Sequence, residues 1–470
     1  MTDLPPVGRQ GWQTVILASV VVFMVSMEIT IIALAFPEIR ARFPDTSEST
    51  LSWIITGYSI GVASLLLIGG WLADRYGLRR AFMAGIALFG FGSLISGLAQ
   101  SPEWLIASRV IQSSGGALQY PAGLALMLVA VPRARHQTAL GIWGATGALA
   151  AAAGPTLGAL LVEGFGWRAV FLINVPIVVL ALIVANRLLD EDTPKSSREG
   201  ADLVSVPLAS LGVGAVILGI VQGQSWGWVS VSTLGVFGLG GFLVAAFVLR
   251  SLRHPAPLFD LGLFRLRTFT VANIAAVFFS IGFFSWLVTL PTMIQTLWGW
   301  SVLKTGFAIA PTPFLSFLIA PQAGRLADRI GNRPLLILSG VSGTIGLLLF
   351  SWQVGTEPEF WTALFLPGMF IGIAAGTGFS QLTGGAMRDV PYHQYAMAGA
   401  GRTTIFQLAV AISIAVGLAV VGRPSTPSAI LDSYDHVWLV GAVCYAAMAC
   451  SVALFYPSRK AISEPQKESR

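Results

Sequence analysis

The feature that most constrains the fold is a series of apolar runs, each about 20 residues long, separated by short polar loops. A helix of that length crosses the hydrocarbon core of a bilayer, whereas a transmembrane strand needs only about ten residues. Charged residues make up 11% of the chain and apolar residues 55%, whereas soluble domains carry roughly 25% charged residues. The chain is therefore predicted to be an all-α integral membrane protein.

Fourteen spans are predicted, and no polar stretch between them is long enough for a soluble catalytic domain. The spans are roughly 12–36, 50–73, 81–98, 103–130, 138–163, 168–187, 206–223, 231–249, 270–297, 302–324, 335–353, 360–386, 396–421 and 436–456. An even number places both termini on one side of the membrane. Lys and Arg are about four times as frequent in the tails and loops of that side as in the opposite loops. This bias predicts that both termini are cytoplasmic.

An internal repeat divides the chain. The segment Gly70–Arg80 (GWLADRYGLRR) returns as Gly324–Arg333 (GRLADRIGNR), and each copy ends one span and leads into the next. Two parallel halves are typical of one large class of transporters. We therefore predict two six-helix bundles, residues 1–187 and 269–470. Residues 188–268 are predicted to hold a polar linker and two extra central helices.

Both copies of the repeat contain residues suited to a tight turn between helices. Glycine allows a sharp turn and close helix approach, and Asp74 can cap the helix that follows it. The matching residues are Gly70, Asp74, Arg75, Gly77, Gly324, Asp328, Arg329 and Gly331. A basic turn that only sets topology would explain the arginines but not the repeated, spaced Asp-Arg-x-Gly. We therefore interpret both copies as more than a turn that sets topology.

One acid lies deep in a predicted span. Glu28 is the only Asp or Glu that we place far inside the hydrocarbon region, where a carboxylate must face a cavity, find a cation or take up a proton. Arg109 lies about 9 Å from the outer end of its span and Glu28 about 12 Å from the end of its own. We interpret Glu28 as a proton-carrying group that faces a cavity within reach of Arg109. The alternatives are a structural ion pair or hydrogen-bonded buried acid for Glu28, and an arginine that snorkels to the interface for Arg109.

On these motifs the chain resembles the fourteen-span drug:proton antiporter family of the major facilitator superfamily, over essentially its whole length. The likeness rests on the repeated loop, on Arg109–Ser113 (RVIQS), where the last residue is usually Gly, and on Glu28–Pro37 (EITIIALAFP), where the family has Asp at the first position and Asn in place of Ala33. The resemblance implies that Arg109 is tied to proton coupling. It also implies that the loop clasps the opposite half and helps to hold the outward-facing state.

The fifth span contains a further element of the resemblance, Gly154-Pro155-Thr156-Leu157-Gly158. Gly154 and Gly158 provide a small-residue face, and Pro155 bends the helix. The resemblance implies that this element marks antiporters and lies on the rocking interface between the halves; an ordinary kinked helix is the alternative. The segment Trp167–Pro176 resembles the start of the family's sixth span, and we interpret it as packing and anchoring.

Seven polar residues within spans are predicted to line a substrate cavity. They are Gln112, Gln119, Tyr120, Asn273, Gln295, Gln381 and Gln407. Each could instead hydrogen-bond one helix to another. Because one carboxylate cannot easily neutralise a dication and also carry a proton, we expect neutral, zwitterionic or monovalent cationic substrates.

The resemblance implies a proton-coupled antiporter that exports amphipathic drugs or antibiotics across a bacterial plasma membrane by alternating access. Its expected partners are a small amphipathic substrate, protons and membrane lipid, without nucleic acid, and the expected state is a monomer. One alternative is a dedicated exporter of an endogenous metabolite or self-made antibiotic. Another is a non-transporting membrane receptor or scaffold. No enzyme, cofactor or metal is predicted, since the chain has no ATP-binding glycine loop and no catalytic triad or metal cluster.

Overall fold

The computed structural model describes residues 5–191, 202, 204–421 and 426–458, and the side chains of a few helical positions, among them Thr30, Ala33 and Pro155, lie outside the described part. Within it the chain is helical and contains no strand. Every predicted apolar run falls on helix, although the sixth is interrupted at Ile173 and the tenth at Ala310.

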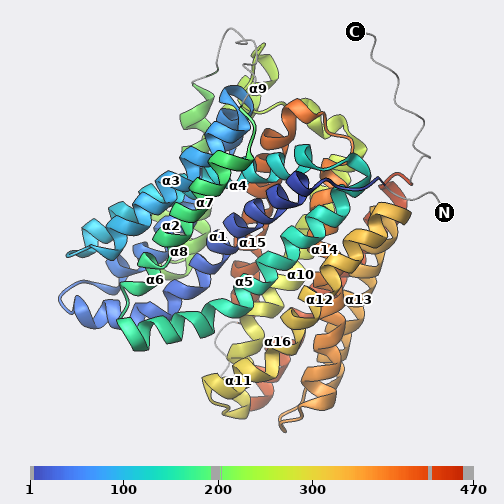
Figure 1. Ribbon diagram of the computed structural model, residues 1–470. Helices are drawn as coiled ribbons and strands as arrows, with labels where there is room; N and C mark the ends of the chain where they lie inside the picture. The colour runs from blue at the N-terminus through green and yellow to red at the C-terminus, as the bar shows by residue number, and fades with distance from the viewer. Residues whose placement is uncertain (1–4, 192–201, 203, 422–425, 459–470) are drawn as a thin grey trace.

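The first seven helices pack against one another and form the N-terminal group (Figure 1). They are α1 (Arg9–Arg42), α2 (Glu48–Tyr76), α3 (Leu78–Gly97), α4 (Pro102–Ala130), α5 (His136–Phe165), α6 (Ala169–Leu172) and α7 (Asn174–Leu188). Glycines bring the helices close: a Cβ on Gly69 of α2 would lie 2.1 Å from the carbonyl oxygen of Ala117 in α4. Such contacts hold helices together by dispersion in a medium that gives no hydrophobic drive.

The C-terminal group repeats this packing with later helices. They are α10 (Arg267–Trp298), α11 (Val302–Ile309), α12 (Pro311–Ile330), α13 (Asn332–Gln353), α14 (Leu366–Met387), α15 (Tyr395–Val421) and α16 (Pro427–Phe455). The buried ring of Tyr445 in α16 lies against Gly282 of α10 and Gly343 of α13, with a distance of 2.5 Å between a Cβ at Gly343 and the ring. Glycine at both positions therefore makes room for the aromatic core of this group.

The last helix begins earlier than the predicted start at about residue 436. α16 begins at Pro427, and the Thr426 hydroxyl accepts a hydrogen bond of 3.3 Å from the backbone nitrogen of Ala429. Threonine at the N-cap followed by proline at the first helical position is a common helix start. The prediction was wrong at this boundary because it followed hydropathy and overlooked the cap.

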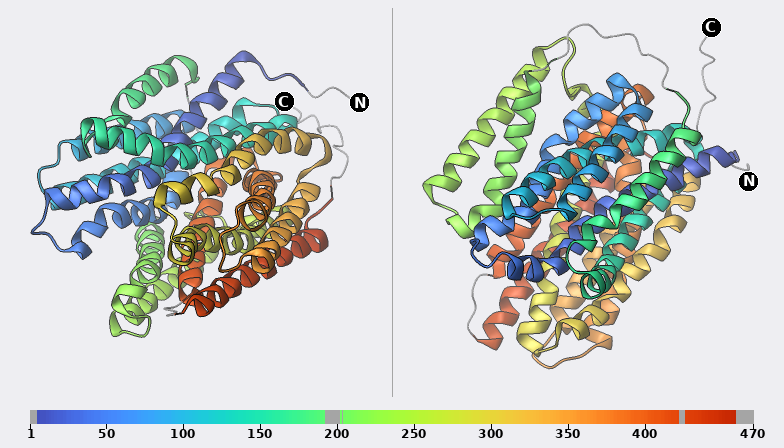
Figure 2. Two further views of the ribbon diagram at one scale, coloured as in Figure 1. Left: turned by 90° about the horizontal axis from the view of Figure 1, so that it is seen from below. Right: turned by 60° about the vertical axis from the view of Figure 1, so that its left-hand side comes forward.

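Two helices, α8 (Ser205–Trp226) and α9 (Val231–Arg253), form a hairpin beside the groups, shown in green in Figure 2. α8 packs against α2 and α15. Asp202, just before α8, accepts a hydrogen bond of 2.6 Å from Nε of Arg250 near the end of α9. This contact ties the two open ends of the hairpin together.

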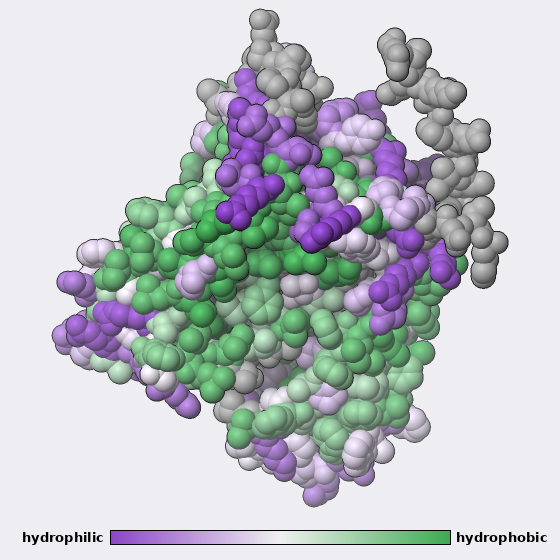
Figure 3. Space-filling view, in the orientation of Figure 1, coloured by the Kyte–Doolittle hydropathy of each residue, from purple (hydrophilic) through white to green (hydrophobic). Residues whose placement is uncertain are grey.

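The two ends of the molecule differ in charge. Arg79, Arg187, Arg250 and Arg388 lie at the end where α2, α7, α9 and α14 finish, which we call the basic end; the described parts of both chain termini lie there as well (Figure 1). The other end, which includes α6 and α11, we call the far end. The two groups meet at the basic end and diverge toward the far end, where a notch separates them (Figure 3).

Twelve helices of the described chain are long and apolar enough to cross a membrane. The number rises to thirteen if α4 and the first part of α5, which bend by 115° at the break between them, count as one span. α4 and α5 are 29 and 30 residues long, but α4 carries Arg109, Gln112 and Gln119, which lower its hydropathy. The predicted number of fourteen is therefore not confirmed by length and composition.

Candidate functional site

Glu28 and Arg109 form an ion pair inside the N-terminal group. Nη1 of Arg109 donates to Oε1 of Glu28 and, over 2.6 Å, to Oε1 of Gln112, while Nε donates to the carbonyl oxygen of Ile54 at 2.9 Å. Both charged side chains are 0% exposed. The two residues predicted to lie within reach of each other are thus in direct contact, and Arg109 does not snorkel to an interface.

Further side chains hold the pair in place. Nδ2 of Asn174, at the start of α7, donates a hydrogen bond of 3.0 Å to the second oxygen of Glu28. The guanidinium of Arg109 lies over the ring of Tyr58, 4.2 Å from its centroid. Sequence reasoning assigned the segment of Asn174 to packing and anchoring, and so missed this partner. An amide inside an apolar run was the signal that could have identified it.

The expectation that Glu28 faces a cavity does not hold in this conformation, because helices α1, α2, α4 and α7 enclose its carboxylate. Arg109 supplies the opposite charge at hydrogen-bond distance, which lets both groups stay away from water. Three enclosed atoms beside the pair have no hydrogen-bond partner among the described residues: Tyr58 Oη, Arg109 Nη2 and Asn174 Oδ1. The hydrogen-bond network around the pair is therefore only partly satisfied.

At the basic end, Asp328 of α12 caps a helix of the opposite group. Its carboxylate accepts hydrogen bonds from the backbone nitrogens of Gln137 at 2.9 Å and Thr138 at 3.1 Å, and also from the Thr138 hydroxyl. These nitrogens belong to the first turn of α5, where backbone N–H groups have no partner within the helix. A carboxylate is favoured there by the helix dipole as well.

The first copy of the repeat makes the same contact in the other direction. Asp74 of α2 accepts hydrogen bonds from the backbone nitrogens of Ala396 at 3.3 Å and Met397 at 2.8 Å, in the first turn of α15. From the residues alone, Asp74 could cap the helix that follows it or pair with nearby arginines, but α3 has no side-chain cap. Gly77, with φ of 110°, ends α2 and turns the chain into α3. Asp74, in the last turn of α2, points across to the opposite group.

The two carboxylates and their helix starts form what we call the clasp: Asp74 with Ala396 and Met397, and Asp328 with Gln137 and Thr138. Glycines of the repeat allow the close approach. A Cβ on Gly70 would lie 2.5 Å from Cβ of Ala400, and one on Gly324 would lie 2.3 Å from the carbonyl oxygen of Gln137. Because the copies are related by the repeat, the clasp is nearly symmetric.

The side chain of Gln137 extends the clasp into the C-terminal group. Nδ2 of Asn332 donates to Oε1 of Gln137 at 2.7 Å and to Oε1 of Gln381 at 2.9 Å. Nothing in the sequence singled out Gln137, since its role exists only where the two groups touch. Gln381, predicted to line a cavity, is enclosed in this network instead.

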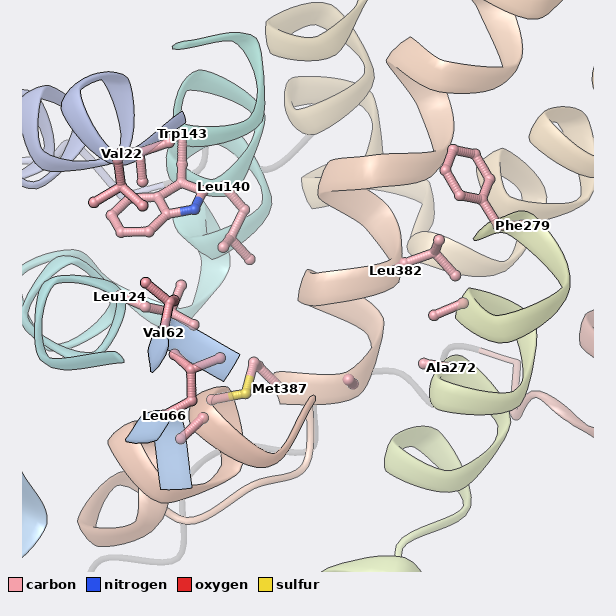
Figure 4. Close-up of a cluster of buried hydrophobic side chains, with 14 of the residues drawn as sticks. Val22, Val62, Leu66, Leu124, Leu140, Trp143, Ala272, Phe279, Leu382 and Met387 are labelled. Carbon is pink, nitrogen blue, oxygen red and sulfur yellow. The ribbon is translucent and has the colours of Figure 1, made fainter. Parts of the chain in front are cut away.

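An apolar layer lies between the two groups near the clasp. Figure 4 shows Met387 of α14 next to Leu66 of α2, with Val62 and Leu124 close by. All four side chains are buried in one hydrophobic cluster that joins both groups. This layer and the clasp together close the molecule at its basic end.

The seven predicted cavity residues separate into two sets. Four are enclosed: Gln112, Gln119 and Asn273 in the packing of their own groups, and Gln381 in the network with Asn332 and Gln137. Gln112 donates to Ser93 Oγ of α3 at 2.7 Å, Asn273 donates to the carbonyl oxygen of Phe269 at 2.8 Å, and Cβ of Gln119 packs against Gly85. For these four the helix-packing alternative describes this conformation better. Tyr120, Gln295 and Gln407 keep partial exposure.

Ser113, the residue that departs from the expected Gly in the fourth span, has a compensating partner. Its Oγ would lie 2.2 Å from a Cβ on Gly61 of α2, so the absence of that Cβ makes room for the hydroxyl. The hydroxyl itself donates to the carbonyl oxygen of Val110 at 2.8 Å. The departure therefore leaves the contact between α2 and α4 intact.

The predicted element in α5 lies partly within its own group. Gly158 packs against α1, with 3.0 Å between its Cβ position and Cγ1 of Ile31, and Gly154 is buried. The side chain of Pro155 lies outside the described residues. α5 touches the opposite group nearer its start, where a Cβ on Gly141 would lie 2.6 Å from the carbonyl oxygen of Ala320 in α12.

Replacing Gly141 with valine is expected to open the basic end. The added side chain meets backbone that cannot give way, so the closed arrangement of α5 and α12 is lost or strongly disfavoured. Spin labels at the exposed positions Tyr76 and Ile330 should report a longer distance between the groups. Gly164→Val is the matched control on the same helix, since nothing lies within 4 Å of a Cβ there. An unchanged distance in the Gly141 variant would show that this contact does not hold the closed state.

Among the described residues, neither a metal site nor a surface groove involves the site residues discussed above. No group of three or more His, Cys, Asp or Glu side chains that could hold a metal occurs in the described residues. A groove of about 550 Å³ lies between α1 and α7 on the outside of the N-terminal group, with Ile16, Leu180 and Val184 in its wall. It is almost wholly apolar and includes none of the predicted site residues.

Comparison with known proteins agrees with this architecture. The sequence profile of the Major Facilitator Superfamily matches residues 18–414 and, in a second match, residues 272–469. The multidrug resistance protein Stp of Mycobacterium tuberculosis (strain CDC 1551 / Oshkosh) is 31% identical over 419 residues, 88% of this chain and 76% of that protein. The tetracenomycin C resistance and export protein of Streptomyces glaucescens is 32% identical over 336 residues, 71% and 62% of the two chains.

Two further comparisons cover nearly the whole chain. The riboflavin transporter RibZ of Clostridioides difficile is 26% identical over 464 residues, 97% of this chain and 100% of that protein. The proton:xylose symporter XylE, solved with 6-bromo-6-deoxy-D-glucose, superposes with a TM-score of 0.65 at 15% identity and covers 95% of this chain and 96% of its own. The latter likeness concerns the fold. The chain is a multi-pass membrane transporter, not an enzyme, and it belongs to the Major Facilitator Superfamily.

Proposed function

We propose that this transporter is a proton-coupled antiporter that exports amphipathic drugs or antibiotics from a bacterial cell by alternating access. The observation that carries the proposal is the enclosed pair of Glu28 and Arg109. Ionisable groups inside a membrane protein are costly and mark ion or proton pathways. Relatives named as a multidrug resistance protein and as a tetracenomycin C resistance and export protein support an exporter of organic compounds.

In the proposed cycle, Glu28 exchanges its proton in a conformation more open than the one described, because here its carboxylate is sealed. Protonation removes the attraction to Arg109 and turns the carboxyl group into a hydrogen-bond donor. Oδ1 of Asn174, which has no described partner, can accept that bond once the amide turns. Proton binding then favours one arrangement of α1, α4 and α7, and substrate binding favours the other.

The clasp supplies the second element of alternating access. We place the basic end in the cytoplasm, which follows the bias of positive charge toward cytoplasmic loops. The described conformation is then closed inward and opens outward at the notch of Figure 3. Release of Asp74 and Asp328 from the starts of α15 and α5 would let the groups rock into the inward-open state.

We further propose fourteen spans, with α4 and α5 each crossing the plasma membrane. Their lengths of 29 and 30 residues exceed the roughly 20 residues that a bilayer requires. This arrangement places both termini in the cytoplasm. It divides the chain into a six-span bundle at residues 1–187, the inserted hairpin within residues 188–268, and a second bundle at residues 269–470, acting as a monomer.

A second candidate is transport of a single metabolite by the same mechanism. The likeness to RibZ favours it, because the alignment covers 97% of this chain and the name of RibZ gives one compound, riboflavin, as the transported substrate. The two functions share every step derived above and differ in the width of substrate choice.

Transport into inverted membrane vesicles tests the proposal. With an acidic lumen, a panel of fluorescent drugs and riboflavin should show accumulation of at least one compound, because outward proton flow through the transporter drives inward substrate flow in this geometry. Several accumulated compounds indicate a drug exporter, and one alone indicates a dedicated exporter. Accumulation that persists after the pH gradient is collapsed, or that equals the signal of vesicles without the protein, would contradict proton-coupled transport.

A further inference from the structure

Arg402 is a second buried arginine, and it lacks the kind of partner that Arg109 has. It lies in α15 with 6% of its surface exposed. Among the described residues no carboxylate pairs with it and no group accepts a hydrogen bond from it, and its Nε is enclosed without a partner. Its described contact is with a ring, since the guanidinium carbon lies 5.0 Å from the centroid of Phe406.

The position of Arg402 puts its charge between the two groups. It lies seven residues beyond Tyr395 at the start of α15, about 10 Å along the helix from the basic end. Gly399, three residues before Arg402 in α15, packs against Leu124 of α4 in the opposite group, with 2.8 Å between its Cβ position and Cδ2 of Leu124, and Leu124 lies one turn beyond Tyr120. The Tyr120 ring in turn packs edge-on against Trp143 of α5, with 5.4 Å between the ring centroids. Arg402 therefore lies where α15, α4 and α5 come together.

Four phenylalanine rings extend from Arg402 toward the far end, and we call them the aromatic wall: Phe283, Phe284, Phe379 and Phe406. Phe406, one turn farther along α15, lies 5.9 Å from Phe284 of α10 and 6.0 Å from Phe379 of α14, measured between ring centroids. Phe283 of α10 lies 5.2 Å from Phe379. All four rings keep partial exposure, unlike the enclosed Phe279 behind them. Such a surface suits a flat aromatic molecule, because rings pack well in offset and edge-to-face arrangements.

The buried charged residues in the membrane-spanning region leave a net positive charge beside the aromatic wall. Glu28 and Arg109 neutralise each other within the N-terminal group, whereas Arg402 has no counter-charge in the part of the chain that the structure describes. A buried cation without an anion or hydrogen-bond acceptors is unfavourable. A guanidinium in that condition is a strong site for a carboxylate or phenolate, which it can bind with two parallel hydrogen bonds.

From this arrangement we propose that Arg402 and the wall of Phe283, Phe284, Phe379 and Phe406 form a substrate site for planar aromatic compounds that carry an acidic group. The acidic group pairs with Arg402 and the rings of the compound lie against the wall. The proposal rests on the transport function proposed above and narrows its substrate class. It departs from the expectation of neutral, zwitterionic or monovalent cationic substrates by requiring an acidic group, because that expectation considered Glu28 alone.

Binding of a matched set of ligands to the full-length protein in lipid nanodiscs tests the site. The probes are 2-naphthoate, 2-naphthylmethanol and 2-naphthylmethylammonium, which share one ring system and differ in charge. We expect 2-naphthoate to bind wild-type protein about tenfold more tightly than the alcohol, and the ammonium to bind most weakly. Arg402→Gln should remove this order, and Arg402→Lys should keep part of it, since lysine retains the charge without the planar fork.

Arg187→Gln is the matched control, because it removes a positive charge from an exposed position at the basic end, away from the wall. The order of affinities should survive in that variant. Equal binding of the three probes to wild-type protein would overturn the proposal even if Arg402→Gln fails to fold, and so would an order that persists in a folded Arg402→Gln. Acid-selective binding in a protein that transports no drug in vesicles would support the site and reject the transport function.

Discussion

Replacing Glu28 with glutamine is expected to abolish transport driven by a pH gradient, lowering the initial rate in inverted vesicles to that of vesicles without the protein. Glutamine keeps the size and a hydrogen-bonding oxygen of the side chain, but it cannot take up and release a proton. Residue 28 can then no longer switch between an ion pair with Arg109 and a donated hydrogen bond to Asn174. Uptake of the best substrate from the panel, measured under an imposed gradient, provides the test.

The structure also permits a purely structural role for the pair, and stability measurements separate the two. Glu28→Gln leaves the charge of Arg109 enclosed without a counter-ion, which typically costs about 3–5 kcal/mol. The double variant Glu28→Gln with Arg109→Gln should recover much of this unfolding free energy, measured by thermal melting in detergent, and still fail to transport. Recovery of pH-driven transport in the double variant would leave the pair with a structural role only.

Replacing both clasp carboxylates, Asp74→Asn with Asp328→Asn, is expected to shift the molecule strongly away from the state closed at the basic end. Each carboxylate accepts two backbone hydrogen bonds at the start of a helix. Hydrogen bonds to charged groups contribute about 1.5–3 kcal/mol, so each single variant should change the ratio of open to closed molecules by about tenfold or more, and the pair by the product. Transport should slow, because most molecules then remain in the state that is open at the basic end.

Labelling of a buried cysteine measures this shift. Met387 lies in the apolar layer beside the clasp and is 2% exposed, so Met387→Cys, in a protein without Cys444 and Cys450, should react slowly with a maleimide. The rate should rise about tenfold in each single clasp variant and further in the pair. Asp190→Asn removes an exposed carboxylate near the same end and should leave the rate unchanged. An unaltered rate in the double variant would mean that the clasp does not hold the closed state.

Prediction from sequence succeeded where a property depends on one helix. Hydropathy located every helix, and the depth of Glu28 and Arg109 along their own helices was enough to foresee their proximity, because the rise per residue of a helix is constant. It was less reliable where a short-range signal was overlooked, as at the start of α16, where Thr426 and Pro427 provide the cap.

Prediction failed where a side chain meets another helix at an angle that the sequence does not encode. The resemblance implied that the repeated loop clasps the opposite half, but it did not specify the partner of Asp74, which caps α15, more than 300 residues along the chain. For the same reason, the sequence did not predict the hydrogen bonds of Gln137 and Asn174 or the enclosure of Glu28. Each depends on which faces of α1, α4, α5, α7 and α12 are turned toward one another.

The amino-acid sequence by itself determined that this chain spans a membrane, that it is built from a repeat, and which charges enter the hydrocarbon region, because the energy of burying each residue depends mainly on its own chemistry. Only the tertiary structure decided that Glu28 is sealed against Arg109, which backbone groups of the opposite group the two aspartates bind, and that Arg402 lies beside four phenylalanines without a counter-charge among the described residues. Pairing energies fall off over a few ångströms, so they exist only once helices distant in the sequence have packed.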